Sequence, residues 1–267
     1  MKLKILYFYP ELLNLYGDRG NIEVLFQRAR KRGIEVEVKE VKLGKVLNKA
    51  DFDEANFVFM GGGSDLNQKT LYEDLLLNKK GFLSDYIESG KVGLFICGAY
   101  QLLGNYYQTE NGEKIPGLGI LNLFTVNEGA KNRSVGNIKT LLSKEVKDVI
   151  FKNSKERTLY GFENHGGQTY FEDKNLKPMA KVLSGFGNNK KSKTEGVIYK
   201  NTFATYLHGP ILAMNPVFCD YLIKQALGID SLDPLNDTLI KEDRANIWLI
   251  YQNNTIVKNW QNNQNTL

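Results

Sequence analysis

The sequence predicts an α/β fold: a largely parallel central sheet flanked by helices, followed by a short C-terminal extension. Short apolar strands alternate with helix-patterned segments as far as Gly104, which is typical of a parallel sheet covered on both faces. Two of these strands run into small residues, at Gly61 and just after Cys97. Ligands of such sheets bind at the carboxyl ends of the strands, so these two junctions mark the expected site.

The first part of the chain supplies strands and helices in alternation. Continuous or alternating apolar residues indicate the strands, and apolar residues three or four positions apart indicate the helices. The expected strands are residues 3–9, 34–41, 55–60 and 92–96, and the expected helices are residues 20–32, 64–77 and 98–103.

The second part of the chain is rich in short strands separated by Gly, Asn and Lys. We expect strands at residues 118–126, 135–140, 158–163, 179–183, 197–200 and 203–207, extending the same sheet. A last helix at residues 216–227 ends before Gly228. The predicted organisation is therefore one domain at residues 1–228 and an extension at residues 229–267, helical or fraying, with an Asn/Gln-rich end.

Composition narrows the class of protein. The 267 residues are 42% hydrophobic and 24% charged, with 35 basic and 30 acidic side chains, so the net charge of +5 is mild and no nucleic-acid partner is expected. The densest basic run, residues 28–32, is interpreted as cations at a helix C-terminus. Two cysteines without a Cys-x-x-Cys pair favour a reducing compartment, and no metal site is expected. With no readable signal peptide or membrane span, the chain is expected to be cytoplasmic.

Cys97 is the strongest candidate for a nucleophile. It follows the apolar strand at residues 92–96 and precedes Gly98 and Ala99, the strand-turn-helix context of a nucleophile elbow. The N–H groups of the helix start favour a thiolate there. A buried cysteine that only fills space is the alternative, and Cys219, within a predicted helix, keeps that interpretation.

A thiolate nucleophile needs a base, and the chain holds two histidines, His165 and His208. His208 follows the strand at residues 203–207 and precedes Gly209 and a proline, so it lies where a strand ends. We prefer His208 on this placement and keep His165 as the alternative.

Gly61, Gly62 and Gly63 follow another strand, and three consecutive glycines indicate a close backbone approach. Their N–H groups are the expected oxyanion hole opposite Cys97. Residues 63–70 also end in Lys-Thr like a phosphate-binding loop, but Gln68 occupies a position where that motif requires glycine. A purely structural turn is the third interpretation.

Four blocks of residues together resemble a known family. They are Met60-Gly61-Gly62-Gly63-Ser64-Asp65, Ile96-Cys97-Gly98-Ala99-Tyr100-Gln101-Leu102-Leu103-Gly104, Tyr160-Gly161-Phe162-Glu163-Asn164-His165 and Tyr206-Leu207-His208-Gly209-Pro210. Their order resembles class I glutamine amidotransferase domains of the cobyric-acid-synthase-like branch, from Tyr7 to about Leu227. Residues 14–18 and Asn132-Arg133 also match.

The resemblance implies a role for each matched residue. Cys97 would attack the side-chain amide of L-glutamine, His208 would protonate the departing ammonia, and residues 61–63 would hold the oxyanion. Gln101 and Arg133 match residues that bind the substrate amino acid. Ala99 and Pro210 depart from the wider class, and Pro210 replaces the glutamate that orients the histidine. We therefore expect a partner subunit to supply that carboxylate.

The resemblance also implies a partner, because ammonia needs an acceptor and this chain has no credible ATP site. The expected partner is a Mur-ligase-like synthetase subunit that uses ATP and Mg²⁺ to amidate the α-carboxyl of D-glutamate in lipid II, giving D-isoglutamine. The lipid-linked substrate would bring the complex to the inner membrane face. A catalytically silent partner-binding subunit, a different carboxylate acceptor, and a nucleotide-binding domain remain alternatives.

Overall fold

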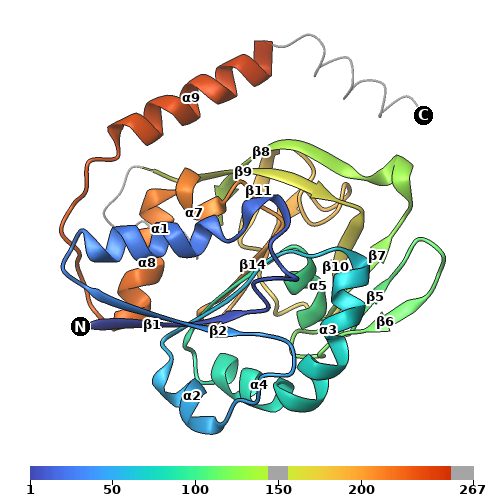
Figure 1. Cartoon of the computed structure of the whole chain (residues 1–267). Helices are drawn as coiled ribbons and strands as arrows, with labels where there is room; N and C mark the ends of the chain where they lie inside the picture. The colour runs from blue at the N-terminus through green and yellow to red at the C-terminus, as the bar shows by residue number, and fades with distance from the viewer. Residues whose placement is uncertain (144–155, 254–267) are drawn as a thin grey trace.

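The computed structural model describes residues 1–143 and 156–253, and its centre is a six-stranded sheet (Figure 1). The strand order is β13 (Val197–Tyr199), β14 (Thr202–Thr205), β4 (Val92–Ile96), β3 (Phe57–Met60), β1 (Lys2–Phe8) and β2 (Glu35–Val41). All neighbouring pairs are parallel except β13 with β14. The predicted α/β fold with a largely parallel central sheet is confirmed.

Burial follows position in this sheet. Every residue of β3 and β4 is buried, because both strands are central and covered on both faces. β2 forms the edge and is mostly exposed or half-buried, which explains its alternating sequence.

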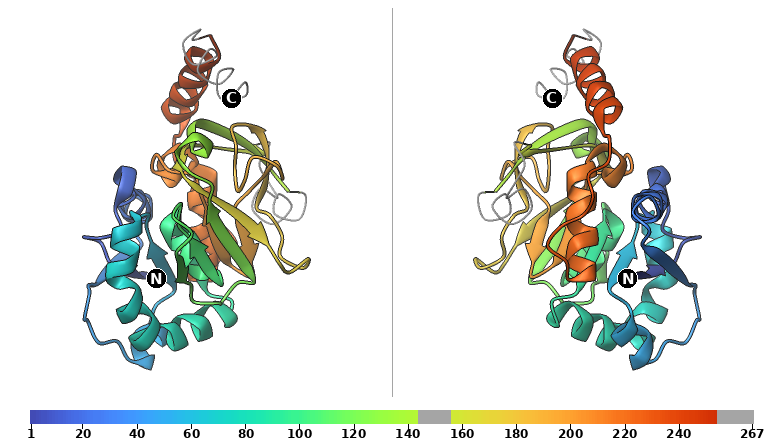
Figure 2. Two further views of the ribbon diagram at one scale, coloured as in Figure 1. Left: turned by 90° about the vertical axis from the view of Figure 1, so that its right-hand side faces the viewer. Right: turned by 90° about the vertical axis from the view of Figure 1, so that its left-hand side faces the viewer.

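Helices cover both faces of the main sheet (Figures 1 and 2). One face carries α1 (Gly20–Arg30), α7 (Ile211–Met214) and α8 (Pro216–Leu227), and the other carries α2 (Lys49–Glu54) and α4 (Lys80–Glu88). α3 (Asp65–Asn78) and α5 (Gly98–Leu103) follow β3 and β4 directly. The prediction misses α2 and α4, although Asn48 and Asp51 form a capping box that marks the start of α2.

The second half of the chain does not extend the main sheet as predicted. Only β13 and β14 join it, and the other strands form two separate four-stranded sheets. One has the order β10 (Gly167–Phe171), β7 (Leu123–Asn127), β5 (Tyr106–Gln108) and β6 (Lys114–Pro116). The other has the order β12 (Thr194–Glu195), β11 (Ala180–Ser184), β8 (Ser134–Leu142) and β9 (Thr158–His165). These pairs are mostly antiparallel and complete their ladders with each other, so they need no edge of the main sheet.

The smaller sheets lie on the side to which the parallel strands point with their carboxyl ends (Figure 1). β9 meets the main sheet just after β14, where Phe162 and His208 exchange both backbone hydrogen bonds, at 3.0 and 2.8 Å. The carboxyl edge is therefore walled by segments far away in sequence.

The chain leaves α8 at Gly228, whose φ of 64° suits glycine, and continues to α9 (Thr238–Asn253) at the periphery (Figure 2). Arg28 of α1 holds this segment against the domain, with ion pairs of 2.7 Å to Asp220 in α8 and to Asp237 just before α9. Arg32 also pairs with Asp220, at 2.7 Å, so these two basic residues bind carboxylates rather than only the helix end. The division at residue 228 stays a prediction, and residues 254–267 of the predicted extension lie outside the described residues.

Within the described ranges, none of the helices combines the length and the apolar character needed to cross a membrane.

Candidate active site

Cys97 lies at a sharp junction between β4 and α5. Its φ of 50° and ψ of −103° are unusual for a residue with a side chain, and its N–H donates to the Thr205 carbonyl at 2.8 Å. This bond fixes the junction against β14. Such strain at a strand end is typical of a functional side chain, and the geometry matches the predicted elbow.

His208 lies just beyond β14 and pairs with a carboxylate that the sequence did not indicate. Its Nδ1 lies 3.0 Å from Oδ1 of Asp18, and both side chains are fully buried. The other oxygen of Asp18, Oδ2, accepts a 2.7 Å hydrogen bond from the Gly62 N–H. The expectation that a partner subunit supplies this acid is wrong, because Asp18 of the same chain already occupies the position.

The electrostatics of this pair favour a charged imidazole. Burial lowers the pKa of His208, but the charge and hydrogen bond of Asp18, together with the adjacent Cys97 sulfur, raise it to about 10. Its Nε2 is buried and makes no hydrogen bond with the described chain. In the charged imidazole this nitrogen carries a proton.

Gly62 shows how closely these groups are packed. A Cβ on Gly62 would lie 3.0 Å from Cε1 of His208, 3.2 Å from Oδ2 of Asp18 and 3.2 Å from Cβ of Cys97. All three side chains thus surround one glycine, and any side chain there would displace them.

The three glycines do not play equal parts, which narrows the predicted oxyanion hole. Gly61 packs against Leu13, so that a Cβ on Gly61 would lie 2.3 Å from the Leu13 carbonyl oxygen. The Gly62 N–H already donates to Asp18. Gly63 alone of the three lines the cavity that contains Cys97. Gly62 is therefore unavailable as a free donor, and the prediction reduces to Gly63.

That cavity has a volume of about 470 Å³. It is lined by residues of the main sheet's carboxyl edge and of both smaller sheets, among them Tyr16, Gly63, Asp65, Gln68, Cys97, Gln101, Tyr107, Asn127, Arg133, Asn164 and His165. A pocket of this size suits a small molecule.

Both predicted substrate-binding residues line the cavity. The Gln101 amide is held between two side chains, donating to the Tyr206 hydroxyl at 3.3 Å and accepting from Nε2 of Gln68 at 3.1 Å. Arg133 donates from Nε to Oδ1 of Asn164 at 2.7 Å. Within the described residues Arg133 has no carboxylate partner, so its charge remains available to a ligand.

His165, the alternative base, also lines the cavity but is held differently. Its ring stacks on Tyr206 with a centroid separation of 3.8 Å, and its Nδ1 lies 2.7 Å from the Gly167 carbonyl. Its Nε2 lies 3.7 Å from a Glu163 oxygen. Only His208 combines a carboxylate at hydrogen-bond distance with a place beside Cys97.

Comparison with known proteins identifies the family. Residues 4–216 match the model of the CobB/CobQ-like glutamine amidotransferase domain. The chain belongs to this family. It is 42% identical over 225 residues to the GatD subunit of lipid II isoglutaminyl synthase (glutamine-hydrolyzing) from Staphylococcus aureus, covering 84% of each chain. It is 40% identical over 250 residues to the GatD subunit from Streptococcus pneumoniae, covering 91% of this chain and 89% of that one.

The fold agrees with this membership. PurLQS from Thermotoga maritima has a similar structure, with a TM-score of 0.56 at 16% identity, covering 85% of this chain and 98% of the other. The resemblance to cobyric-acid-synthase-like amidotransferases and the class I glutamine amidotransferase fold are both confirmed.

In this amidotransferase domain, residues 63–70 do not form a phosphate-binding loop. Ser64 caps α3 by accepting from the Asn67 N–H, and the Gln68 side chain fills the turn beneath Gly63. Lys69 points outward to Glu113, 2.6 Å away. The nucleotide-binding alternative therefore lacks the cradle and the lysine that it requires.

A second reactive cysteine and a metal centre also find no support. Cys219 is fully buried in α8, and burial is the main cause that raises the pKa of its thiol. Among residues 1–143 and 156–253, no group of three or more His, Cys, Asp or Glu side chains is placed to hold a metal ion.

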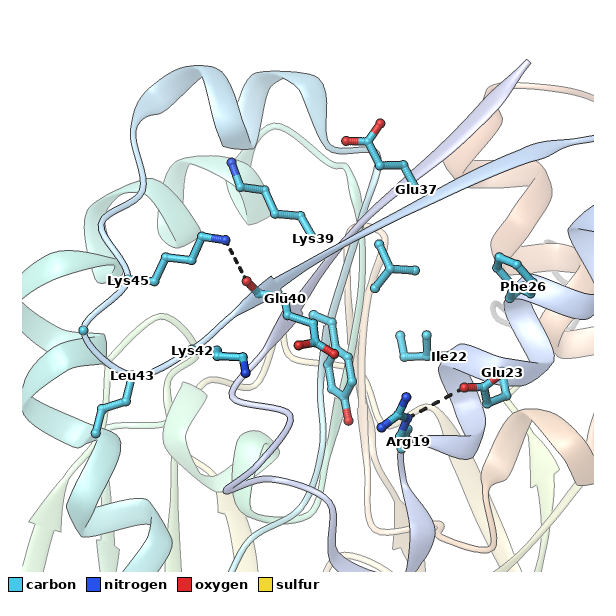
Figure 3. Close-up of a pocket in the computed structure, with 13 residues that line it drawn as sticks. Arg19, Ile22, Glu23, Phe26, Glu37, Lys39, Glu40, Lys42, Leu43 and Lys45 are labelled. Atoms are coloured by element: carbon cyan, nitrogen blue, oxygen red, sulfur yellow. Dashed lines mark hydrogen bonds and ion pairs between the residues drawn. The ribbon is translucent and has the colours of Figure 1, made fainter.

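A larger hollow, of about 1010 Å³, lies elsewhere, between β2 and α1 (Figure 3). Figure 3 shows Arg19 directed at Glu23, with which it forms an ion pair, and Lys45 directed at Glu40, where it donates to the backbone carbonyl at 3.0 Å. Neither Cys97 nor His208 lines it. The larger volume of this hollow therefore does not mark the reactive residues. The smaller cavity, which Cys97 lines, is the candidate active site of this amidotransferase domain.

Proposed function

We propose that this chain is the glutamine-hydrolysing subunit of a lipid II isoglutaminyl synthase. It converts L-glutamine and water to glutamate and ammonia and passes the ammonia to a ligase subunit. The observation that carries the hydrolysis is the buried cluster of Cys97, His208 and Asp18, of which Cys97 lines a cavity of about 470 Å³. The 42% and 40% identities to GatD subunits support lipid II as the acceptor of the ammonia.

The reaction follows from this cluster. The Cys97 thiolate attacks the side-chain amide carbon of glutamine, and His208 gives its Nε2 proton to the amide nitrogen. The C–N bond breaks, ammonia leaves and a thioester remains on Cys97. A water molecule then attacks the thioester, gives a proton to His208, and releases glutamate and the thiolate. Asp18 holds the imidazole in orientation throughout.

The negative charge on the tetrahedral intermediate is stabilised by backbone N–H groups of Gly63 and Gly98. Support for this pair is their proximity, since a Cβ on Gly98 would lie 3.1 Å from the Gly63 nitrogen. Gly98 also follows the nucleophile directly, which is the usual place for one such donor. Gln101 and Arg133 bind the amino-acid part of glutamine.

The partner is a Mur-ligase-like synthetase that uses ATP and Mg²⁺ and amidates the α-carboxyl of D-glutamate in lipid II. The names of the GatD relatives support a second subunit and this acceptor. The lipid-linked acceptor would bring the complex to the membrane surface.

The test is hydrolysis of L-glutamine labelled with ¹⁵N at the side-chain amide, by the chain together with its ligase, ATP and lipid II. We expect glutamate release and ¹⁵N in the stem peptide with the wild type. Cys97→Ala and His208→Ala should abolish release, whereas Cys219→Ala, the matched control, should retain it. His165→Ala should retain turnover with a raised KM.

Each contrary outcome has a distinct meaning. Glutamate release by Cys97→Ala would refute the nucleophile. No release by the wild-type complex would favour a catalytically silent, partner-binding subunit. Release without ¹⁵N in lipid II would point to a different carboxylate acceptor.

A further inference from the structure

Besides His165, the side chains that line the cavity at Cys97 include one positive and one negative charge. Arg133 supplies the cation from the start of β8, and Asp65 supplies the anion from the start of α3. Among the described residues that line the cavity, no other Asp, Glu, Lys or Arg is present. A cavity with this pairing suits a zwitterion better than a neutral amide or a dianion.

Asp65 is held so that one oxygen remains open. The Tyr107 hydroxyl donates to Oδ2 of Asp65 at 3.2 Å and itself accepts from the Asn127 amide at 3.1 Å. Burial, and after it the charge of Asp65, raise the pKa of Tyr107, so this hydroxyl stays protonated and donates. Oδ1 of Asp65 has no hydrogen-bond partner among the described residues, which leaves it for a ligand.

Gln68 adds a second acceptor on the same helix face. It lies three residues after Asp65 on α3, where side chains point in the same direction. Its Nε2 donates to the Gln101 oxygen at 3.1 Å and, at 3.4 Å, to the Gly63 carbonyl. The residue is only 1% exposed, and its Oε1 has no hydrogen-bond partner within the described chain. A buried acceptor without a donor is costly, so a ligand in the cavity that supplied a donor to this oxygen would be stabilised by it.

We propose that Asp65 and Gln68 form the subsite for the α-ammonium group of the substrate. An ammonium group has three donors and no acceptor. It therefore matches two acceptors that lack a donor, the Oδ1 carboxylate oxygen of Asp65 and the Oε1 amide oxygen of Gln68. Arg133 then binds the α-carboxylate. The inference rests on the proposed glutamine hydrolysis and adds that the enzyme selects a free amino acid by its α-ammonium group.

The test compares two substrates that differ only in this group. L-Glutamine has the α-ammonium, and glutaramate has the same chain and terminal amide without it. The chain is assayed with its ligase as wild type, as Asp65→Asn, and as Asp85→Asn, a matched control on an exposed aspartate of α4. The measured quantity is the ratio of kcat/KM for L-glutamine to kcat/KM for glutaramate.

We expect this ratio to fall at least about tenfold in Asp65→Asn and to stay at its wild-type value in Asp85→Asn, since one hydrogen bond to a charged group is lost. Asparagine keeps an oxygen for Tyr107, so the fold should be retained, and a general loss of structure would lower both rates together. An unchanged ratio in Asp65→Asn would overturn the subsite alone. Failure of the wild type to hydrolyse glutamine would overturn the proposed function, and the subsite with it.

Discussion

Asp18 and His208 are separated by 190 positions in the chain, yet Oδ1 of one lies 3.0 Å from Nδ1 of the other inside the protein. Because Oδ2 of Asp18 also accepts the Gly62 N–H at 2.7 Å, the carboxylate fixes the imidazole and the glycine loop together. The structure therefore brings a carboxylate, an imidazole and the Cys97 thiol together within one chain.

Asp18→Asn should lower kcat by about 10²- to 10⁴-fold with a small effect on KM, because the imidazole loses the charge that holds its orientation. The measurement is steady-state glutamine hydrolysis by the chain with its ligase, with Asp85→Asn as the control for loss of a carboxylate. A normal kcat for Asp18→Asn in the assembled complex would mean that another subunit supplies the acid.

The stability of the protein should depend on pH through His208. Its pKa is raised in the folded state from 6.5 to about 10. The protonated form is therefore favoured by folding, and its contribution to the free energy of unfolding is complete below pH 6.5 and lost as the pH rises through about 10. Urea unfolding from pH 6 to 10 should show the difference between wild type and His208→Gln shrinking with rising pH. A difference that stays constant or grows with pH would contradict the charged imidazole.

Gly62→Ala tests how tightly the site is packed. The added methyl group would lie 3.0 Å from the His208 ring and 3.2 Å from Cβ of Cys97, so we expect kcat/KM to fall at least about tenfold in a folded protein. Gly81→Ala is the matched control, because a Cβ at Gly81 would meet nothing within 4 Å. Equal activity of the two variants would show that the glycine loop has room that the structure does not indicate.

The sequence predicts the local parts of this site better than its assembly. Cys97 was predictable because an apolar strand and two small residues define its turn within a few positions. His208 was predictable as the end of a strand. The role of Asp18 was not, because a carboxylate in a loop acquires a partner only through tertiary packing. A signal did exist, since residues 14–18 match the family, but a match alone assigns no role.

The prediction that strands in the second half of the chain extend the main sheet was wrong for a related reason. A short alternating strand such as β8 or β11 shows which face is buried but not which strand it pairs with. The separate sheets matter for function, because Arg133, which directly precedes β8, and His165, the last residue of β9, both line the cavity.

Arg28→Met should destabilise the protein by about 1–3 kcal/mol, because Asp237 would lose its cation while Asp220 keeps its ion pair with Arg32. The Arg28 side chain is 8% exposed and pairs at 2.7 Å with both Asp220 and Asp237. Arg30→Met, at an exposed position of the same helix, is the control and should have a small effect. Chemical unfolding monitored by circular dichroism measures both, and equal stabilities would argue against the anchoring of the segment before α9.

The most direct measurement is covalent labelling of the assembled complex with 6-diazo-5-oxo-L-norleucine, an electrophilic analogue of glutamine, followed by mass spectrometry of the cysteine peptides. If Cys97 is the nucleophile of a glutaminase, the adduct forms on Cys97, excess L-glutamine prevents it, and Cys219 stays unmodified. An unmodified Cys97, or an adduct on Cys219 instead, would contradict it.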